Sequence, residues 1–324
     1  MTEQKLLQEV AQNRPLNETR MFLLGQGGVG KTSLLKQLMG SDFDPYEGKT
    51  EGIYSTPWCI KVDSRNIRLN VWDFGGQEIM PSLHHFFLTK RSLYLVVLNV
   101  RVEPAEKQIE RWVKMIQSFG DRSPIIIVGN KNDQYRLDLD RDRLLDSYAP
   151  NLKDIVETSC AEGDGIAKLK EAISREVAGL EHIRDKLPNS WFAIKTQLEE
   201  IKQDCNCIPY IPYSEYIRLC QDQDIRNDTS QRNLIRLLHD LGIVINFQDD
   251  PDLKDIIILD HEWVTNSVYR ILNSYELFHK KGVLSEQALD RVLNSQENPG
   301  NKHIIDIMRR CDCPKVVGFE LTAL

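Results

Sequence analysis

The chain has 324 residues, of which 41% are hydrophobic and 27% charged, and this balance is typical of a globular protein with two domains. No apolar run approaches the roughly 20 residues that a bilayer span needs, and the first residues lack the basic start and apolar stretch of a secretory signal, so we expect no membrane partner. Seven scattered cysteines, an odd number, argue against a disulfide framework and favour a cytoplasmic location, while the net charge of −7 argues against a general affinity for nucleic acid.

The glycine content changes along the chain. Of the 18 glycines, 14 lie at or before Gly179, so tight turns belong mainly to the first part. The polar segment 181–190, which carries Pro188, follows a helical pattern and is predicted to be a linker. The predicted divisions are an N-terminal extension over 1–18, a first domain over 19–180, the linker, and a second domain over 191–324.

Apolar strands alternate with helical patterns through the first domain. Pro104 in the first turn and Gly120 after the end are expected to bound its longest helix. Uniformly apolar strands separated by helices indicate an α/β fold with a mainly parallel sheet covered on both faces, and such sheets bind ligands in loops beyond the carboxyl ends of their strands. The predicted strands are 19–25, 58–63, 67–73, 94–100, 124–129 and 154–159, and the predicted helices are 31–40, 104–120 and 166–180.

The first strand runs into a glycine-rich loop of the form G-x-x-x-x-G-K-[ST], from Gly25 to Thr32. Such a loop turns its backbone N–H groups toward phosphate oxygens at the positive end of the following helix. Lys31 would supply a charge for the β- and γ-phosphates, and the Thr32 hydroxyl is placed to bind Mg²⁺. An ordinary glycine-rich turn is the alternative. The nucleotide-binding residues expected here are Gly25, Gly28, Val29, Gly30, Lys31, Thr32 and Ser33.

The segment Asn130-Lys131-Asn132-Asp133 follows a predicted strand and indicates which base is bound. A carboxylate at Asp133 would accept N–H bonds from guanine N1 and the 2-amino group, whereas adenine offers an acceptor at N1 and no 2-amino group. The Lys131 stem can cover the base, and Asn130 can tie this loop to the phosphate loop. After the last strand, a backbone N–H of the loop residues Ser159, Cys160 and Ala161 can meet guanine O6.

Three residues at and after the 67–73 strand have expected roles near the γ-phosphate. Asp73 would hold Mg²⁺ through water, with a helix N-cap as the alternative role. Gly76 offers a free N–H to the γ-phosphate, and Gln77 beside it can orient the attacking water. For Gln77, a solvated loop residue is the alternative.

The polar segment 41–57 has no apolar periodicity and is predicted to be a loop. Thr50 is its best candidate to coordinate Mg²⁺ only when the γ-phosphate is present, and Thr56 is the alternative residue. A loop held by that contact is released on hydrolysis, which makes it a switch.

In this order, the motifs resemble the Ras-like small GTPases over residues 19–180. The stretch from His84 to Thr89 and the strand that leads to Arg101 are similar to the Roc domain of the Roco proteins, the group that includes the leucine-rich-repeat kinases. The resemblance implies a Ras-like P-loop GTPase domain, with a mainly parallel six-stranded sheet and helices on both faces, followed by an α+β winged-helix-like first COR subdomain. Four segments are similar to the first half of COR: 188–191, 210–220, 237–247 and 258–273.

The chain also departs from the family pattern. His261 stands where proline is expected, and Cys160 with Ala161 replaces the Ala-Lys of a Ras-like last loop, so that lysine is lost while backbone recognition of O6 survives. We find neither leucine-rich repeats nor a kinase signature, and the COR resemblance stops near residue 320, so we expect a fragment. The family implies a homodimer that largely uses the later COR half, so this chain is expected to be monomeric or weakly dimeric.

The second domain has its own helical and hairpin patterns. A helix is predicted to open at Asp228, with an apolar stripe of four leucines, and the turn 249–252 suggests a hairpin before a helix capped by Asp260. Helix, helix and hairpin outline a winged helix, a fold that often binds DNA. The acidic excess of this domain opposes phosphate approach, so a protein-contact module is favoured over a DNA reader. The leucines of the stripe are Leu234, Leu237, Leu238 and Leu241.

These expectations converge on a GTPase that uses Mg²⁺ and converts GTP to GDP and phosphate. Lys31 holds the phosphates, Thr32, Thr50 and Asp73 organise the metal, and Gln77 positions water. Arg101 is a candidate cation that acts within the chain or across a dimer, with a plain surface arginine as the alternative. A scaffold that binds GTP without appreciable turnover is the competing function. The expected partners are guanine nucleotide, a second copy of the chain and unknown effector proteins, with no nucleic acid and no membrane.

Overall fold

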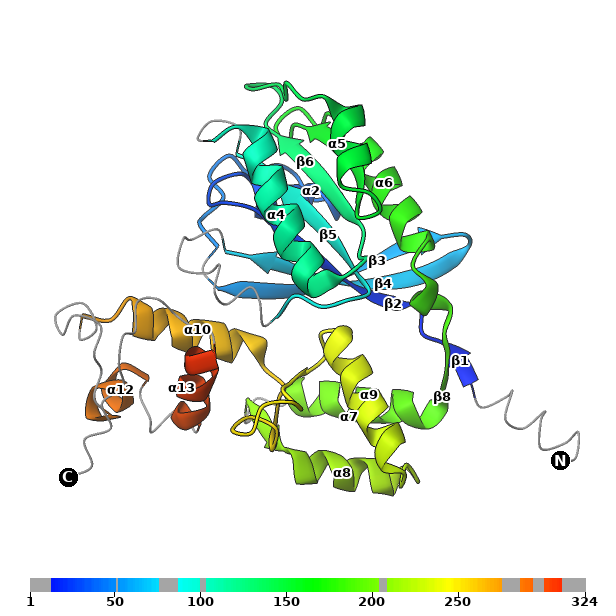
Figure 1. Ribbon diagram of the computed structural model, residues 1–324, viewed down its shortest axis with the longest axis vertical. Helices are drawn as coiled ribbons and strands as arrows, with labels where there is room; N and C mark the ends of the chain where they lie inside the picture. The colour runs from blue at the N-terminus through cyan, green and yellow to red at the C-terminus, as the bar shows by residue number, and fades with distance from the viewer. Residues whose placement is uncertain are drawn as a thin grey trace, which may run out of the picture. The chain divides into compact units, whose positions relative to one another are not determined.

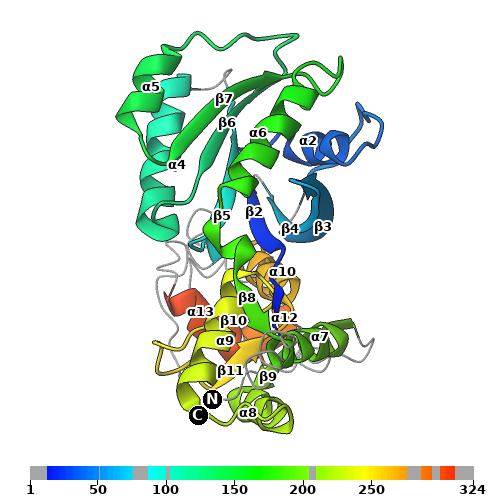
Figure 2. The same cartoon turned by 90° about the vertical axis from the view of Figure 1, so that its right-hand side faces the viewer.

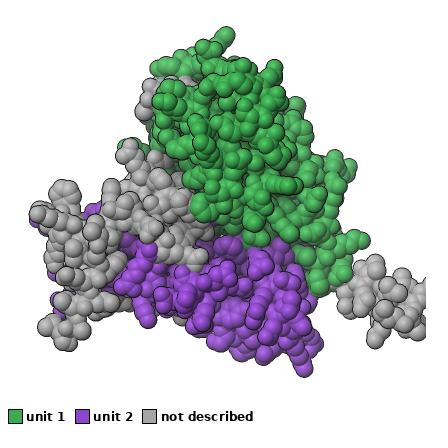
Figure 3. All heavy atoms as spheres, viewed as in Figure 1, with its two compact units in different colours: residues 1–78, 88–189, 240–242 green, residues 79–87, 190–239, 243–324 purple. Residues whose placement is uncertain are grey.

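The computed structural model describes residues 13–50, 52–75, 87–99, 103–203, 209–275, 286–293 and 300–310. The chain divides into two compact units (Figure 3). Unit 1 comprises residues 1–78, 88–189 and 240–242, and unit 2 comprises residues 79–87, 190–239 and 243–324. Among the described helices, none is long and apolar enough to cross a bilayer.

A six-stranded sheet forms the centre of unit 1, in the order β3-β4-β2-β5-β6-β7 (Figure 1). All neighbouring strands are parallel except β3, which runs antiparallel to β4. The mainly parallel α/β sheet is therefore confirmed. The strands are β2 (Glu18–Leu24), β3 (Ile53–Val62), β4 (Arg65–Phe74), β5 (Ser92–Val97), β6 (Ile125–Asn130) and β7 (Leu152–Thr158).

Helices cover both faces of this sheet, as Figure 2 shows, with α4 on one side and α2 and α6 on the other. Because successive side chains of a strand point to opposite faces, Met21 and Leu23 of β2 join a core cluster that includes Leu34 of α2. Phe22 lies between them and stacks on Tyr94 with ring centroids 4.9 Å apart. Uniformly apolar strands are thus buried on both faces. The helices of unit 1 are α2 (Lys31–Leu38), α4 (Ala105–Gly120), α5 (Arg141–Ser147) and α6 (Ile166–Ala178).

Two local expectations for unit 1 are wrong. Gly120 was expected after its helix, but it is the last residue of α4, where a Cβ would lie 3.0 Å from the Tyr94 ring; the chain leaves the helix at Asp121, with a positive φ of 56°. Residues 53–57 were expected in a loop, but they open strand β3, and Thr56 pairs with Val71 of β4. The start of β3 was predicted as a loop because its residues are mostly polar. Such residues are tolerated there because β3 is an edge strand with one exposed face.

The segments predicted as N-terminal extension and linker are paired with each other in unit 1. Strand β1 (Asn13–Pro15) pairs antiparallel with β8 (Lys186–Pro188), and the Leu16 N–H donates to Asp185 O over 2.9 Å. A 3₁₀ helix, η1 (Glu181–Arg184), precedes β8 and buries Ile183. The polar composition therefore belongs to a folded segment rather than to a free linker.

Unit 2 combines helices with a small sheet in the order β10-β11-β9. The hairpin expected around the turn 249–252 is present as β10 and β11, and Asp260 caps α10 by accepting from the Glu262 N–H over 2.9 Å. The predicted stripe of α9 needs one correction, because Ile235 is buried and Leu237 is only half-buried. The elements are α7 (Asn189–Gln203), β9 (Tyr210–Pro212), α8 (Tyr213–Asp222), α9 (Asp228–Asp240), β10 (Ile245–Asn246), β11 (Ile256–Ile258), α10 (His261–Leu272), α12 (Glu286–Leu293) and α13 (Asn301–Arg310).

His182 of η1 generates a prediction about pH. Thr19 Oγ1 donates to Arg91 O over 3.1 Å, so the Nε2 of a neutral His182 is the donor in the 3.0 Å bond to Thr19 Oγ1. Burial, and then the charge of Arg91, lowers the pKa of His182 from 6.5 to about 4. Below pH 6.5 His182 is therefore protonated in the unfolded chain but stays neutral in the folded chain until the pH approaches 4. The free energy of unfolding falls as the pH drops from 6.5 toward 4, by at most about 3 kcal/mol.

The variant His182→Gln keeps an N–H donor near the Nε2 position and cannot titrate. Urea unfolding at pH 7, 6, 5 and 4.5 should show a smaller loss of stability on acidification for this variant than for the wild type. Parallel pH profiles for the two proteins would rule out His182 as the titrating group.

Candidate functional site

The motif residues of unit 1 gather at the carboxyl ends of its strands. The loop of residues 25–30 follows β2, Asp73 is the second-last residue of strand β4, the 131–133 segment follows β6, and Ser159 follows β7. Parallel neighbours bring these ends to the same edge of the sheet. This edge is the candidate functional site.

The loop after β2 needs its first glycine. Gly25 has a φ of 143°, and a Cβ there would lie 2.2 Å from Val97 O of β5. Gly30, with a φ of 89°, is the residue before α2, and Lys31, Thr32 and Ser33 form its first turn. The N–H groups at this helix end are those expected to meet phosphate oxygens.

The side chain of Lys31, the first residue of α2, is buried against this loop. Its Nζ donates to Gly25 O and Gln26 O, each over 2.9 Å. Burial lowers the pKa of Lys31 from 10.5 to about 8, and the charge of Asp73 opposes that shift. Lys31 is therefore still protonated at pH 7 and places a positive charge where the loop wraps around it.

Three oxygen-bearing side chains meet beside Lys31. Thr32 Oγ1 lies 2.6 Å from both Asp73 Oδ2 and Thr50 Oγ1. Because a carboxylate only accepts, Thr32 donates its proton to Asp73, and the Thr50 hydroxyl donates to Thr32. Burial raises the pKa of Asp73 from 3.8 to about 6, while the Thr32 hydrogen bond and the Lys31 charge lower it, so Asp73 is ionised at pH 7.

This oxygen set suits a hard cation such as Mg²⁺. Asp73 Oδ1 is buried and has no hydrogen-bond partner among the residues described, so the carboxylate retains capacity for a cation or its water. Within the same residues, no group of three or more His, Cys, Asp and Glu side chains could hold a metal. A cation at Asp73 would therefore depend on hydroxyl, water and phosphate oxygens for its remaining ligands.

Asn130 joins the loop after β6 to the loop after β2, as its sequence position suggested. Its Nδ2 donates to Val29 O over 3.0 Å, and its Oδ1 accepts from the Thr158 hydroxyl over 3.2 Å. Lys131, with a φ of 66°, donates from Nζ to Gly28 O over 2.8 Å. The two loops are therefore connected by two side chains.

Asp133 is exposed and is oriented by the loop after β7. Ser159 Oγ donates to Asp133 Oδ1 over 2.6 Å, and this bond is the main reason why the pKa of Asp133 is lowered. The next residue, Cys160, is buried, and burial raises the pKa of its thiol to about 11, so the group stays protonated. Ala161 is exposed beside it.

The segments that carry Thr50 and Asp73 are also tied together. The Gly75 N–H donates to Gly52 O over 2.8 Å, and a Cβ on Gly75 would lie 2.7 Å from Thr50 O. Thr56 lies inside β3, so Thr50 is the threonine that reaches Thr32. Gly76, Gln77 and Arg101 lie outside the described residues.

The sequence analysis did not identify two side chains, Gln108 and Glu157, that hold loops at this edge of the sheet. Gln108 of α4 accepts from the Asn99 N–H and donates to Asn99 O and Glu103 O, so it holds both ends of the segment between β5 and α4. Glu157 of β7 accepts from the Leu137 N–H over 2.7 Å and from Arg141 Nη2 over 2.9 Å. The position of Gln108 on the apolar face of a helix could have indicated a buried polar contact, because an unpaired Gln is rarely buried. Nothing in the sequence indicates that Glu157 contacts residues 137 and 141.

Comparison with known proteins identifies two domain families along the chain. The family model described as "Ras of Complex, Roc, domain of DAPkinase" matches residues 20–133. The model described as "C-terminal of Roc, COR-A domain" matches residues 188–316. The solved structure of Methanosarcina barkeri Roco2 RocCORdC bound to GDP superposes with a TM-score of 0.82 at 38% identity, over 93% of this chain and 92% of that one.

Curated relatives extend far beyond the matched region. A probable serine/threonine-protein kinase, pats1, of Dictyostelium discoideum is 29% identical over 310 residues, which cover 88% of this chain and 10% of that protein. A Roc-COR-CHAT protease of an unknown prokaryotic organism is 30% identical over 285 residues, which cover 81% of this chain and 26% of that protein. The chain thus spans about a tenth and a quarter of the lengths of these two relatives.

Replacing Asn130 by alanine tests the connection between the two loops. The change removes the partner of Val29 O and the acceptor of the Thr158 hydroxyl at a buried position, so we expect the free energy of unfolding to fall by about 1–3 kcal/mol. Urea unfolding without nucleotide measures it. The matched control is Asn132→Ala, two residues further along the chain, whose free energy of unfolding should stay within about 0.5 kcal/mol of the wild type. Equal losses for the two variants would contradict the connecting role of Asn130.

Proposed function

The chain belongs to the Roc–COR family of Roco proteins, and from this we propose that it is a Mg²⁺-dependent GTPase that binds GTP and GDP, hydrolyses GTP to GDP and phosphate, and acts as a nucleotide-controlled switch coupled to its COR part. The observation that carries the proposal is the hydrogen bond from Asn130 Nδ2 to Val29 O. It joins the loop that would bind phosphate to the loop whose carboxylate, Asp133, would select guanine. The GDP bound by the Methanosarcina barkeri protein supports the choice of nucleotide.

The backbone N–H groups of the 25–30 loop and the Lys31 ammonium group would bind the phosphates. Gly25 and Gly30 leave room for the turn, and Lys31 already carries its charge in a place that water reaches poorly. Bound phosphate oxygens would offer Lys31 stronger acceptors than the neutral carbonyls it now contacts. The remaining proposed phosphate ligands are the backbone at Gly28, Val29, Thr32, Ser33 and Gly76.

Guanine selection is assigned to the loops after β6 and β7. The ionised Asp133 would accept from N1 and the 2-amino group, with Ser159 holding one carboxylate oxygen in place. Lys131 would lie along the base, and the backbone of residues 159–161 would donate to O6. Cys160 contributes through its backbone in this scheme, because its thiol is buried and protonated.

Thr32, Thr50 and Asp73 would hold Mg²⁺, which would neutralise negative charge on the phosphates during hydrolysis. Gln77 would orient the attacking water. An additional cation raises the rate of such reactions by about 10³–10⁵, and we assign that role to Arg101. The homodimer and the effector proteins expected from the family stay predictions.

Single-turnover phosphate release from protein loaded with GTP separates hydrolysis from the competing function, a scaffold that binds GTP without turnover. The wild type should release close to one phosphate per chain, and chelation of Mg²⁺ should stop the release. Gln77→Leu and Arg101→Ala should still bind GTP but release phosphate at least about tenfold more slowly. Lys31→Ala should bind neither nucleotide. Tight GTP binding without release by the wild type would favour the scaffold, and unchanged rates would remove Gln77 or Arg101 from the mechanism.

A further inference from the structure

The segment that carries Asp133 is long and irregular. Residues 131–140 connect β6 to α5 without a strand or helix, and most of them are exposed. At its start, the segment is fixed by Lys131 and by the Asn132 N–H, which donates to Thr158 O over 3.0 Å. An exposed carboxylate in such a segment keeps its direction only if the far end of the segment is fixed as well.

The carboxylate of Glu157 fixes that far end. Its Oε1 accepts from the Leu137 N–H over 2.7 Å, and its Oε2 accepts from Arg141 Nη2 over 2.9 Å. Arg141 is the first residue of α5, and its Nη1 also donates to Ile155 O over 3.2 Å. Each oxygen of Glu157 thus holds a different part of the chain that follows Asp133.

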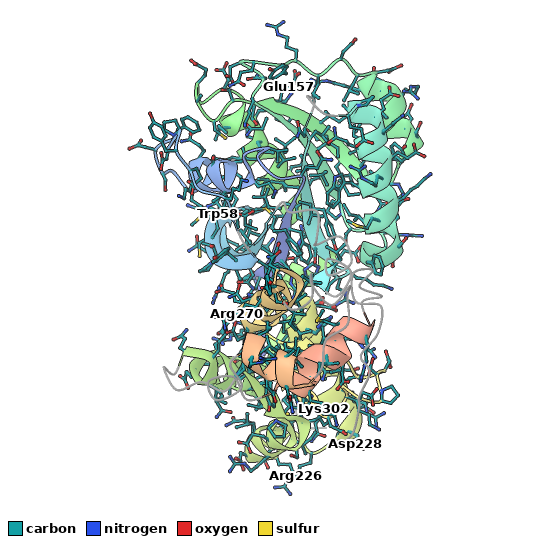
Figure 4. All side chains as sticks on the ribbon, turned by 90° about the vertical axis from the view of Figure 1, so that its left-hand side faces the viewer. Trp58, Glu157, Arg226, Asp228, Arg270 and Lys302 are labelled. Atoms are coloured by element: carbon teal, nitrogen blue, oxygen red, sulfur yellow. The ribbon has the colours of Figure 1, made fainter. Side chains whose placement is uncertain are left out.

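Packing supports the same contact. A Cβ on Gly129 would lie 2.4 Å from Leu137 Cδ1, so the Leu137 side chain sits directly on the backbone of β6 just before Asn130. Glu157 also immediately precedes Thr158 and Ser159, which bond Asn130 and Asp133. Figure 4 labels Glu157 near the upper end of unit 1.

We propose that Glu157, together with Arg141, is a positioning residue for guanine selectivity: it holds the segment after Asp133 so that the carboxylate meets the N1–H and 2-amino groups in line. The proposal rests on the proposed guanine nucleotide binding and extends it to residues that touch no nucleotide. It predicts that loss of Glu157 weakens recognition of the base more than recognition of the phosphates.

The test compares GDP with inosine diphosphate, which lacks only the 2-amino group. A hydrogen bond to a charged group is worth about 10-fold or more in affinity, so the wild type should prefer GDP by at least that factor. In Glu157→Ala, calorimetric titration should show GDP binding weakened by roughly tenfold or more and the GDP preference reduced at least threefold. Glu157→Gln, which keeps an acceptor for Leu137 N–H, should be intermediate.

Asp154→Asn is the matched control. Asp154 lies on the same strand, β7, and makes a 2.9 Å ion pair with Arg175, but it contacts no part of the 131–140 segment in the described structure. This control should keep the GDP preference of the wild type. Arg141→Ala removes the other half of the contact, and its effect should be less than additive with Glu157→Ala because the two residues act through one contact.

The outcomes separate this inference from the proposed function. A wild-type protein that binds ADP as tightly as GDP would overturn the proposed function. A selective wild type together with a Glu157→Ala variant that keeps the GDP preference, or that loses affinity equally for both diphosphates, would overturn the positioning role. If Glu157→Ala does not fold, Arg141→Ala gives the same test, because its half-exposed side chain can be removed without opening the core.

Discussion

The candidate site depends on the hydrogen bond from Asn130 Nδ2 to Val29 O, which joins two loops that lie 101 residues apart in the sequence. In the proposed function, the phosphates and the base are recognised by loops that follow different strands, so a nucleotide would be held at both ends only if those strand ends keep a fixed separation. The bond achieves this because Gly30 has no side chain: a Cβ there would lie 2.5 Å from Asn130 Nδ2. Asn130 is buried, so its hydrogen bonds are protected from exchange with water.

Burial also sets the electrostatics of the site. Lys31 and Asp73 are removed from water, which lowers the pKa of the lysine to about 8 and raises that of the aspartate to about 6. Both groups stay charged at pH 7, although each pKa lies only about one unit from that pH. Each charge also favours the charged form of the other group. A bound phosphate group would lie near the Lys31 charge and a bound cation near the Asp73 charge. Each would stabilise a charged group that burial has separated from water, so ligand binding would stabilise the folded site.

The sheet, and the position of the motif loops at the carboxyl ends of its strands, were predictable because both depend on local patterns. Continuous apolar runs indicate strands that are covered on both faces, and the order of loop, strand and loop placed Lys31 and Asn130 at one edge. The segment 181–190 was misread because its polar composition conceals the buried Ile183 and a backbone pairing with residues 13–15. Glu157 was missed because its partners are fixed only by the path of the 131–140 segment in the folded chain. Tertiary contacts between polar residues leave no periodic trace in a sequence.

If folding unites an amide-lined phosphate loop with a purine-selecting carboxylate, as we propose, the purified chain should discriminate strongly between GDP and ADP when the two compete for binding. Asp133 would accept from guanine N1 and its 2-amino group, whereas adenine would leave the carboxylate facing an acceptor, so GDP should bind at least about 100-fold more tightly. Equal affinities for the two diphosphates, measured by calorimetry under the same conditions, would show that Asp133 does not select the base.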